Sequence, residues 1–317
     1  MAFNIGGVTT AYINQIDPTL FTLAVGESTT AKDLIAAGSV VFGKGRVPIR
    51  KMDLDANFQS GLDACARNAS GNITLTDTYM DIVRFKDEKD LCFQSLENTY
   101  FSLLAKQSIQ PSEEGATPEF ANEIIKLRVA KIAEANEQAL WISNTGVTQS
   151  GTVAGIAYGS DYANFNKIDG IVKQVSSTYS TMTATGSDIV AKLRSAVLSL
   201  PVKIYTASDF RLAIGQDLYN QYVAAIASLN IYNEKSLDMI FGTTVKFWVV
   251  PGLNGLNKVY GIRLSNLRLG MANQDDADRV DIEYIKTNLF HGWASDVYWS
   301  MGVKVINTAE VGYLAYS

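Results

Sequence analysis

The chain has 317 residues, of which 47% are hydrophobic and 19% are charged, so it can bury a large core and is not disordered over most of its length. This length is typical of about two domains. With 27 basic and 32 acidic side chains the net charge is −5, which argues against tight electrostatic binding to duplex nucleic acid. The sequence contains no long apolar run and no basic block ahead of an apolar one near its start, so we expect neither a membrane-spanning helix nor a signal peptide.

Cysteine and histidine are too scarce for most metal or nucleophilic chemistry. Cys65 and Cys92 have no CxxC partner, and His291 is the single histidine. A structural zinc site needs about four such ligands, and a Ser-His-Asp or Cys-His nucleophile would have to use His291. Because His291 lies among aromatic residues between two expected strands, we interpret it as a packing or turn residue. We therefore predict a protein that is not an enzyme, with no cofactor and no metal site.

Two motifs resemble functional sites but lack essential residues. The stretch that begins at Asp53 resembles the start of a calcium loop, but its sixth position is Phe58 and its twelfth is Ala64, where such a loop needs Gly and Glu. We interpret it as a solvated turn. Neither the GxxxxGK[ST] phosphate loop nor the GxSxG turn of an α/β hydrolase is present.

Residues 1–37 have the composition of an arm. They are rich in Thr, Gly and Asn, contain Pro18 and show no sustained hydrophobic period. Such a segment buries little surface against itself, so its apolar residues need another surface.

Residues 40–86 predict a long two-stranded excursion. Short apolar segments at 40–42 and 47–49 flank a glycine turn, and a return leg follows at 73–76 and 82–86. Pro48 cannot donate a backbone hydrogen bond, which indicates an edge strand. Because a two-stranded ribbon is marginal alone in water, we expect residues 1–90 to bury their apolar side chains only on a neighbouring copy of the chain.

Two helices are expected next, a shorter one at 93–106 and then the clearest helix of the chain. Thr117 is a good N-cap and Pro118 a good first residue for this second helix, which runs without Gly to a stop near 144–146. It carries two apolar stripes, so it should pack on more than one surface. The first stripe contains Phe120, Ile124 and Leu127, and the second contains Ile125, Val129, Ile132 and Ala139.

The region after a predicted loop at 145–166 alternates between α and β patterns. We predict a helix from Ser187 to a stop at Pro201, a strand at 202–205, a helix that begins at Ser208 or Asp209, and strands at 245–250 and 258–262. Together they predict a compact α/β unit. The last strands, at 280–285, 297–299 and 303–306, should pack back on the long helix and complete a domain made of two chain segments.

This order of elements resembles the major capsid proteins of tailed bacteriophages, with the Hong Kong 97-like fold. Short stretches resemble the family in the same order along the chain. They are 91–97 (LCFQSLE), 134–141 (EANEQALW), 165–171 (FNKIDGI), Leu200-Pro201, 249–253 (VVPGL), 266–270 (NLRLG), Gly302-Val303 and 311–313 (VGY).

The resemblance implies an α+β capsid fold with five segments. These are an N-terminal arm (1–37), an extended β-loop (38–90), a peripheral domain with a long spine helix (91–165), an inserted α/β axial domain (166–280) and the returning strands of the peripheral domain (281–317). Many family members carry a scaffolding segment ahead of the arm, whereas Met1 here lies at the arm, so we expect a separate scaffolding protein or none.

The resemblance also implies a function. The chain would be a major capsid protein that self-assembles into hexamers and pentamers of an icosahedral shell around phage double-stranded DNA. It would reside in the virion capsid after assembly in the host bacterial cytoplasm. Its partners would be other copies of itself, a portal, scaffolding and decoration proteins, and DNA bound without sequence specificity, but no membrane.

We expect the intersubunit contacts to combine apolar burial with charge pairing. Apolar and basic residues of the excursion would meet an acidic patch on the next copy, although exposed ion pairs are weak. The excursion residues are Val40, Phe42, Lys44, Arg46, Val47, Ile49, Arg50 and Lys51, and the acidic patch is Asp275, Asp276, Asp278, Asp281 and Glu283. Some family members cross-link a loop lysine to a neighbour's Asn, and Lys44 and Lys51 are placed for this, but the sequence identifies no partner Asn or activating acid.

Two alternatives remain open at this point. An encapsulin-type compartment shell would share the fold and enclose protein cargo instead of DNA. An extracellular adhesin or surface-layer module would suit the Thr- and Asn-rich β segments, but it predicts a secretion signal that the sequence lacks.

Overall fold

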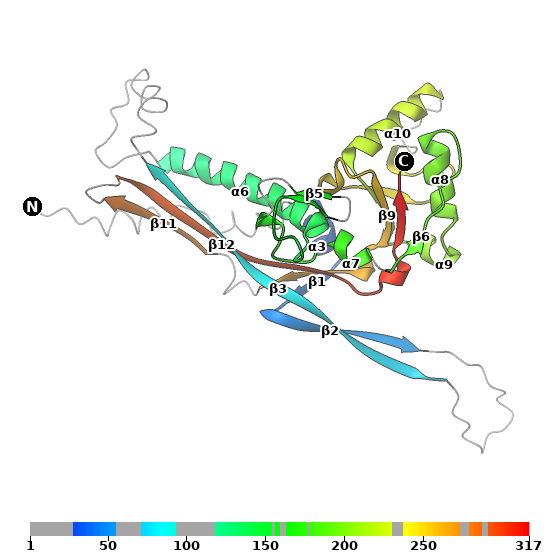
Figure 1. Cartoon of the computed structure of the whole chain (residues 1–317), viewed down its shortest axis with the longest axis horizontal. Helices are drawn as coiled ribbons and strands as arrows, with labels where there is room; N and C mark the ends of the chain where they lie inside the picture. Colours follow the sequence, from blue (N-terminus) through cyan, green and yellow to red (C-terminus); the bar gives the residue numbers. More distant parts are fainter. Residues whose placement is uncertain are drawn as a thin grey trace, which may run out of the picture.

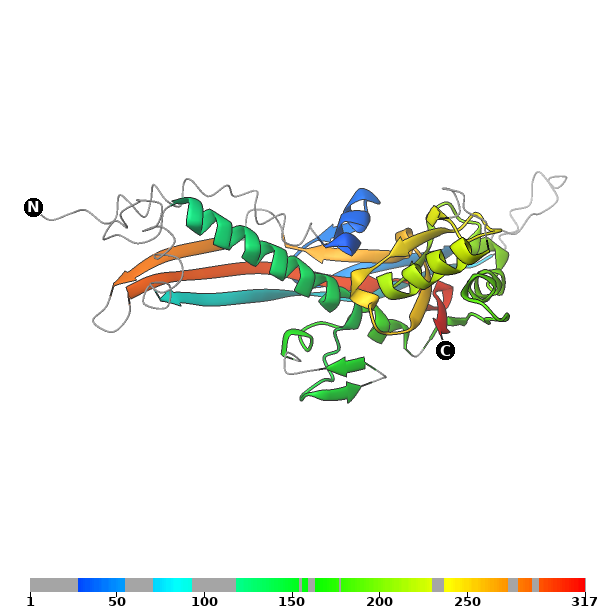
Figure 2. The ribbon, with the colours of Figure 1, turned by 90° about the horizontal axis from the view of Figure 1, so that it is seen from above.

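The computed structural model describes residues 28–54, 71–92, 118–153, 156–158, 163–176, 178–229, 237–272, 279–286 and 291–316. Helix and sheet are mixed. A long, twisted six-stranded sheet runs along the molecule with helix α6 (Pro118–Ile142) beside it, and a second, five-stranded sheet with its own helices lies at one end (Figures 1 and 2).

The centre of the six-stranded sheet is a strand from the C-terminal region, β12 (His291–Val305). It pairs antiparallel with β3 (Ile73–Cys92), with β11 (Arg279–Lys286) and with β10 (Leu267–Met271), and β1 (Val40–Phe42) adds to β10 in parallel. The strands expected at 297–299 and 303–306 are one continuous strand. His291, expected between strands, is the first residue of β12.

The predicted two-stranded excursion is confirmed. Strand β2 (Gly45–Leu54) pairs with the first half of β3, from Ile73 to Ile82, and the second half of β3 pairs with β12. Pro48 therefore lies on an edge strand, as predicted. The ribbon projects beyond the rest of the molecule (Figure 1). Its base is a sheet completed by β12, a strand about two hundred residues further along the chain.

Helix α6 begins at Pro118 and ends at Ile142, close to the predicted bounds. On its second apolar stripe Val129, Ile132 and Ala139 are buried in the main core. On the first stripe Leu127 is 65% exposed. The Trp299 indole donates a 3.0 Å hydrogen bond to the Asn136 amide oxygen, so the returning strand packs on the long helix, as expected.

The five-stranded sheet has the order β6 (Ser180–Thr181), β13 (Gly312–Ala315), β9 (Lys258–Arg263), β7 (Phe210–Ile214) and β8 (Lys246–Val249). Helices α8 (Ile189–Leu198) and α10 (Gln216–Ser228) pack with it around a second core, with α9 (Val202–Tyr205) at the margin of that core. Helix α7 (Ile171–Val175) is buried in the main core instead. The strands predicted at 245–250 and 258–262 and the helix predicted from Ser187 are confirmed.

Three local predictions in this region are wrong. Residues 202–205 form helix α9 rather than a strand, because Pro201 opens a helical turn in which Ile204 N–H donates to its carbonyl. The predicted helix from residue 208 begins as strand β7 and becomes helix α10 only after Gly215. Strand β7 is central and buried on both faces, so its sequence lacks the alternation that identifies a strand. The predicted loop at 145–166 contains a hairpin of β4 (Gly151–Val153) and β5 (Ile156–Tyr158). The helix predicted at 93–106 lies outside the described residues.

The expectation that residues 1–90 need a neighbouring copy is wrong for part of that segment. Helix α3 (Thr29–Ala36) packs on its own chain, where Ala31 and Leu34 are 0% exposed. Ser28 caps this helix, since its hydroxyl accepts a hydrogen bond from Ala31 N–H. The amphipathic helix is short, and it is stabilised by tertiary contacts that the sequence alone does not reveal.

Candidate assembly surfaces

The two faces of the β2–β3 ribbon have different surroundings. Residues directly opposite each other in an antiparallel pair share a face, and successive pairs alternate between faces. We call outer face the one that carries the pairs Leu54–Ile73, Met52–Leu75, Arg50–Asp77, Pro48–Tyr79 and Arg46–Asp81. We call inner face the one that carries Asp53–Thr74, Lys51–Thr76, Ile49–Thr78, Val47–Met80 and Gly45–Ile82.

The apolar side chains at the base of the inner face are buried by residues of the same chain. Ile49, Met80 and Ile82 are 8%, 1% and 6% exposed and form a small core with Val47 and Ile306. Ile49 and Val47, both expected to be buried by a neighbouring subunit, are thus packed without one. This burial holds the root of the ribbon against the sheet.

The outer face leaves its apolar side chains in solvent. Met52 is 68% exposed, Ile73 and Leu75 are each 63% exposed, and Tyr79 is 47% exposed. Single exposed apolar residues are ordinary, but several of them on one face of a projecting ribbon are typical of an interaction surface. None of the four was a predicted contact residue. The alternation of Ile73 and Leu75 with Thr74 and Thr76 is the signal that could have identified two of them.

The basic residues of the ribbon pair with acids of the same ribbon. Arg46 lies 3.9 Å from Asp81 and Arg50 lies 3.6 Å from Asp77. The Arg46 guanidinium also sits 4.5 Å above the ring centroid of Tyr79. Because the charged groups are mostly exposed, each pair contributes less than about 1 kcal/mol. These charged pairs alternate with the apolar pairs along the outer face.

The other predicted contact residues that the structure describes lie on or beside strands β1, β2 and β11. Phe42 is 57% exposed, Val40 is packed against the main core, Lys44 is exposed and Lys51 is half-buried. Of the predicted acidic patch, Asp281 and Glu283 belong to strand β11. Asp275, Asp276 and Asp278 lie outside the described residues.

A buried carboxylate anchors helix α3 to helix α6. Glu137 is 3% exposed and accepts hydrogen bonds from the backbone N–H and the hydroxyl of Thr30, at 2.9 and 2.6 Å. The Trp141 indole donates to that hydroxyl at 2.7 Å, and on the next turn Asp33 accepts from the Trp248 indole at 2.5 Å. Burial raises the pKa of Glu137, while the hydrogen bonds from Thr30 oppose this rise. Four long-range hydrogen bonds therefore hold the short helix in place.

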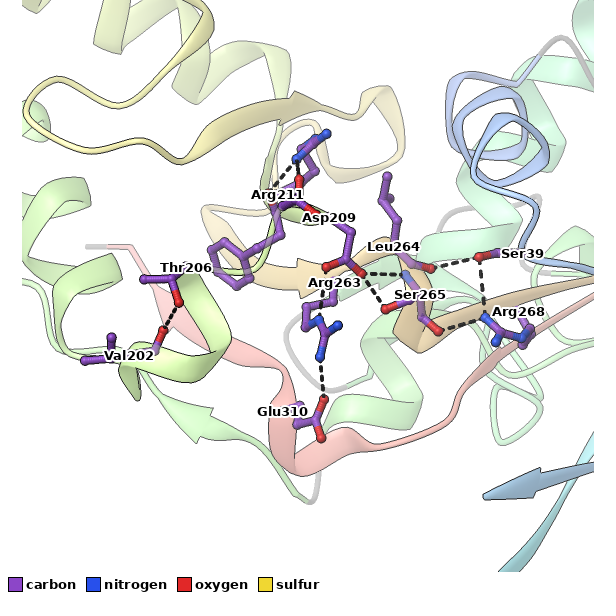
Figure 3. A network of polar contacts seen from close by, with 12 residues as sticks. Ser39, Val202, Thr206, Asp209, Arg211, Arg263, Leu264, Ser265, Arg268 and Glu310 are labelled. Carbon is purple, nitrogen blue, oxygen red and sulfur yellow. Dashed lines mark hydrogen bonds and ion pairs between the residues drawn. The ribbon is translucent and has the colours of Figure 1, made fainter. Parts of the chain in front are cut away.

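A polar network joins strands β7 and β9 to the turn before β13 (Figure 3). Asp209 accepts hydrogen bonds from the backbone and hydroxyl of Ser265 and, at 3.1 Å, from Arg263 Nε. Glu310 lies 3.8 Å from the other side of the Arg263 guanidinium. Burial alone would raise the pKa of Asp209, but the bonds from Ser265 and Arg263 outweigh it and hold this pKa below its usual value.

The same network continues toward the six-stranded sheet. The Ser39 hydroxyl, just before β1, donates to the Leu264 carbonyl at 3.1 Å, and Arg268 donates to the Ser265 carbonyl at 2.7 Å (Figure 3). Residues 264–266 link β9 of one sheet to β10 of the other, and Arg268 lies at the start of β10. The network therefore fixes the connection between the two sheets.

Within the described parts of the chain, no cluster of three or more His, Cys, Asp or Glu side chains is arranged to hold a metal ion. No described helix is long and apolar enough to cross a membrane.

Comparisons with known proteins identify the fold. No protein-family model matches the chain, and no curated protein matches it. A chain of the satellite phage P4 procapsid, solved with its size determination (Sid) protein, aligns at a TM-score of 0.56 and 11% identity over 99% of this chain and 98% of that one. A chain of Microbacterium phage Oxtober96 aligns at 0.53 and 10% identity over 90% of both chains. A chain from the capsid of Myoviridae phage XM1 aligns at 0.50 and 15% identity, over 89% of this chain and 91% of that one.

These alignments extend over most of each chain, so the similarity includes both sheets rather than one motif. The chain therefore has the mixed helix-and-sheet fold of phage major capsid proteins, and the resemblance read from the sequence is confirmed for the fold.

Proposed function

We propose that this chain is the major capsid protein of a tailed bacteriophage, and that its copies assemble into hexamers and pentamers of an icosahedral shell around double-stranded DNA. The shell would form in the host bacterial cytoplasm and become the virion capsid. A portal, a scaffolding protein and decoration proteins would be its partners, and contact with packaged DNA would be sparse because the net charge is −5.

The observation that carries this proposal is the outer face of the ribbon, on a chain with a capsid fold. Its apolar side chains are exposed, and the ribbon that carries them projects beyond the rest of the molecule (Figure 1). Full burial of such side chains on a second copy would contribute about 1.5–3 kcal/mol each before the cost of ordering and association. Because every copy both donates a ribbon and receives one, many such contacts would add up in a closed shell.

The charged contacts are a separate part of the proposal. Lys44, Arg46, Arg50 and Lys51 would face the acidic segment 275–283 of the next copy, with the arginines shared between that segment and their own ribbon acids. Reversal of Arg46 and Arg50 to Glu should lower particle yield at physiological salt. An unchanged particle yield would refute the charge pairing between copies, but it would not affect the proposed apolar contact.

The experiment on the apolar contact compares the two faces of the ribbon. Full-length protein is expressed alone and with a candidate scaffold, and particles are counted by negative-stain electron microscopy. Met52→Asp and Leu75→Asp place a charge on the outer face, whereas Thr74→Asp and Thr76→Asp place the same charge on exposed positions of the other face. We expect the outer-face variants to lower particle yield at least tenfold and the matched controls to assemble normally.

A chain that stays monomeric under all conditions would overturn the proposed function. Normal assembly of both outer-face variants would overturn the apolar contact of the ribbon. Particles that contain DNA support a virion, whereas particles that contain a cargo enzyme would identify an encapsulin-type compartment instead.

A further inference from the structure

A cavity of about 230 Å³ lies where the end of α6, the β5 strand and helix α7 meet the five-stranded sheet. Its floor is buried: Val175, Tyr260, Ile156 and Val172 are 1%, 2%, 3% and 5% exposed. Its rim is accessible, since Lys173, Ser176 and Tyr179 are exposed and line the same space. The cavity is therefore a pocket with a closed apolar base and a polar opening.

Tyrosine side chains form part of the walls and hold each other in place. The rings of Tyr179 and Tyr313 pack edge to face with centroids 4.9 Å apart, and Tyr313 lies 5.3 Å from Tyr260. The Tyr158 hydroxyl donates to the Ile142 carbonyl at 2.5 Å, which fixes the opposite wall. An apolar cavity of about 150 Å³ is enough to hold benzene, so this pocket has room for one ring and one small polar group.

The polar groups of the pocket favour an anion. Among the described residues that line it, Lys173 and Lys258 are basic and none is acidic. Burial lowers the pKa of Lys258, so burial penalises its charged form, and an anion bound in the pocket would stabilise that form. Burial raises the pKa values of Tyr260 and Tyr313, which keeps both hydroxyls protonated as donors. Among the described residues, the Tyr260 hydroxyl makes no hydrogen bond.

We infer that this pocket binds a small carboxylic acid that carries one ring-sized apolar group, with the ring among the tyrosines and the carboxylate at Lys258. Two sources share this chemistry: a free aromatic acid, and the C-terminal residue of a protein partner when that residue is apolar. The site is separate from the ribbon, so it goes beyond the proposed assembly function and does not depend on it.

The test measures binding to the full-length protein by isothermal titration calorimetry. Benzoate is the probe, and benzyl alcohol is a neutral control of similar size. We expect benzoate to bind with a Kd of about 1 mM or below and benzyl alcohol to bind at least tenfold more weakly. Lys258→Met keeps the apolar stem and removes the charge, so it should weaken benzoate at least tenfold. Lys246→Met, at an exposed position of β8 that does not line the pocket, is the matched control and should bind as the unaltered protein does.

Additional ligands separate the sources. N-acetylphenylalanine that binds more tightly than benzoate supports a protein C-terminus, and the reverse order supports a free acid. Phenyl phosphate that binds at least tenfold more tightly than benzoate would overturn the carboxylate assignment in favour of a phosphate ester. Should Lys258→Met fail to fold, Tyr260→Phe removes only a hydroxyl, and it should weaken benzoate several-fold.

Equal binding of benzoate and benzyl alcohol, or no binding of benzoate at 10 mM, roughly ten times the expected Kd, would overturn the inference. So would unchanged benzoate affinity in a folded Lys258→Met protein. Particle assembly of the same variant is recorded in parallel. Normal assembly with lost binding is the expected result, and it separates failure of this inference from failure of the proposed function.

Discussion

Gly270 and Gly302 lie directly opposite each other on strands β10 and β12. A Cβ on Gly302 would come within 2.5 Å of the Asp81 carbonyl oxygen, and a Cβ on Gly270 within 2.7 Å of side-chain atoms of Met80 and Ile82. This is where β3, after its pairing with β2, begins to pair with β12, since Val83 is the first residue of β3 in chain order that pairs with β12. The two glycines therefore let the root of the ribbon lie directly on the sheet backbone.

Gly302→Ala should destabilise the chain and reduce assembly. The added methyl group meets a backbone oxygen, so the ribbon itself must shift, and overpacking of this kind costs about 1–3 kcal/mol. Gly270→Ala meets the ends of two side chains that can rotate, and we expect a smaller loss. Urea unfolding of unassembled protein and particle counts measure both effects. Equal loss for the two variants would contradict this role of the ribbon backbone.

Helix α3 should depend on the buried carboxylate of helix α6. Glu137→Ala removes the acceptor for the Thr30 N–H and hydroxyl, and loss of hydrogen bonds to a charged group costs about 1.5–3 kcal/mol. Hydrogen exchange should then show lost protection across residues 30–37. Glu134→Ala on the exposed side of the same helix is the control and should leave this protection intact. Protection that survives in both variants would mean that apolar packing alone holds α3.

The apolar contacts of α3 should be measurable in dilute, unassembled protein. Leu34 is 0% exposed and Ile35 is 44% exposed, so the two neighbours form a matched pair. Leu34→Ala should lower the free energy of unfolding by about 2–5 kcal/mol through lost burial and a cavity, and Ile35→Ala by less than about 1 kcal/mol. A similar effect of the two substitutions would indicate that α3 packs elsewhere in solution.

The link between the two sheets should weaken in acid. The pKa of Asp209 is held below its usual value by Ser265 and Arg263, so its ionised form stabilises the folded state. This stabilisation is complete above the unfolded pKa of about 3.9 and is lost as the pH falls through the lower folded pKa. Asp209→Asn should destabilise the protein at pH 7 by roughly 1–3 kcal/mol and flatten the pH dependence of its stability below about pH 4.

The control for this prediction is Asp77→Asn in the exposed ribbon pair, which should change stability by less than about 0.5 kcal/mol. Thermal unfolding followed between pH 3 and pH 7, a window around the ordinary aspartate pKa of about 3.9, tests both variants. If the stability of Asp209→Asn falls in acid as steeply as that of the unaltered protein, another group causes the acid sensitivity.

Elements governed by short-range patterns could be predicted from the sequence. Helix α6 starts at Pro118, which suits the first helical position, and its stripe through Val129 and Ile132 is buried. The two strands of the ribbon follow from apolar segments on either side of turn residues. The prediction failed at β7 because Phe210 and Ile214, four residues apart, fit a helix as well as a doubly buried strand.

The candidate surface could be predicted only in part. Phe42, a predicted contact residue, is exposed and available for such a contact, whereas Ile49 and Val47 are packed by Met80 and Ile82 of the paired strand and by Ile306. Which face of the ribbon is covered depends on the register between β2 and β3, since a slip of one residue exchanges the faces.

The sequence by itself determined the bounds of helix α6, the strands at 246–249 and 258–263, and that a long two-stranded ribbon forms, because these features depend on residues a few positions apart. Only the tertiary structure decided that β12 forms the base of that ribbon, that α3 packs on Glu137 and Trp141, and that Met52, Ile73, Leu75 and Tyr79 stay exposed together. These outcomes come from contacts between residues far apart in the chain, and local propensity carries no information about which distant surfaces will meet.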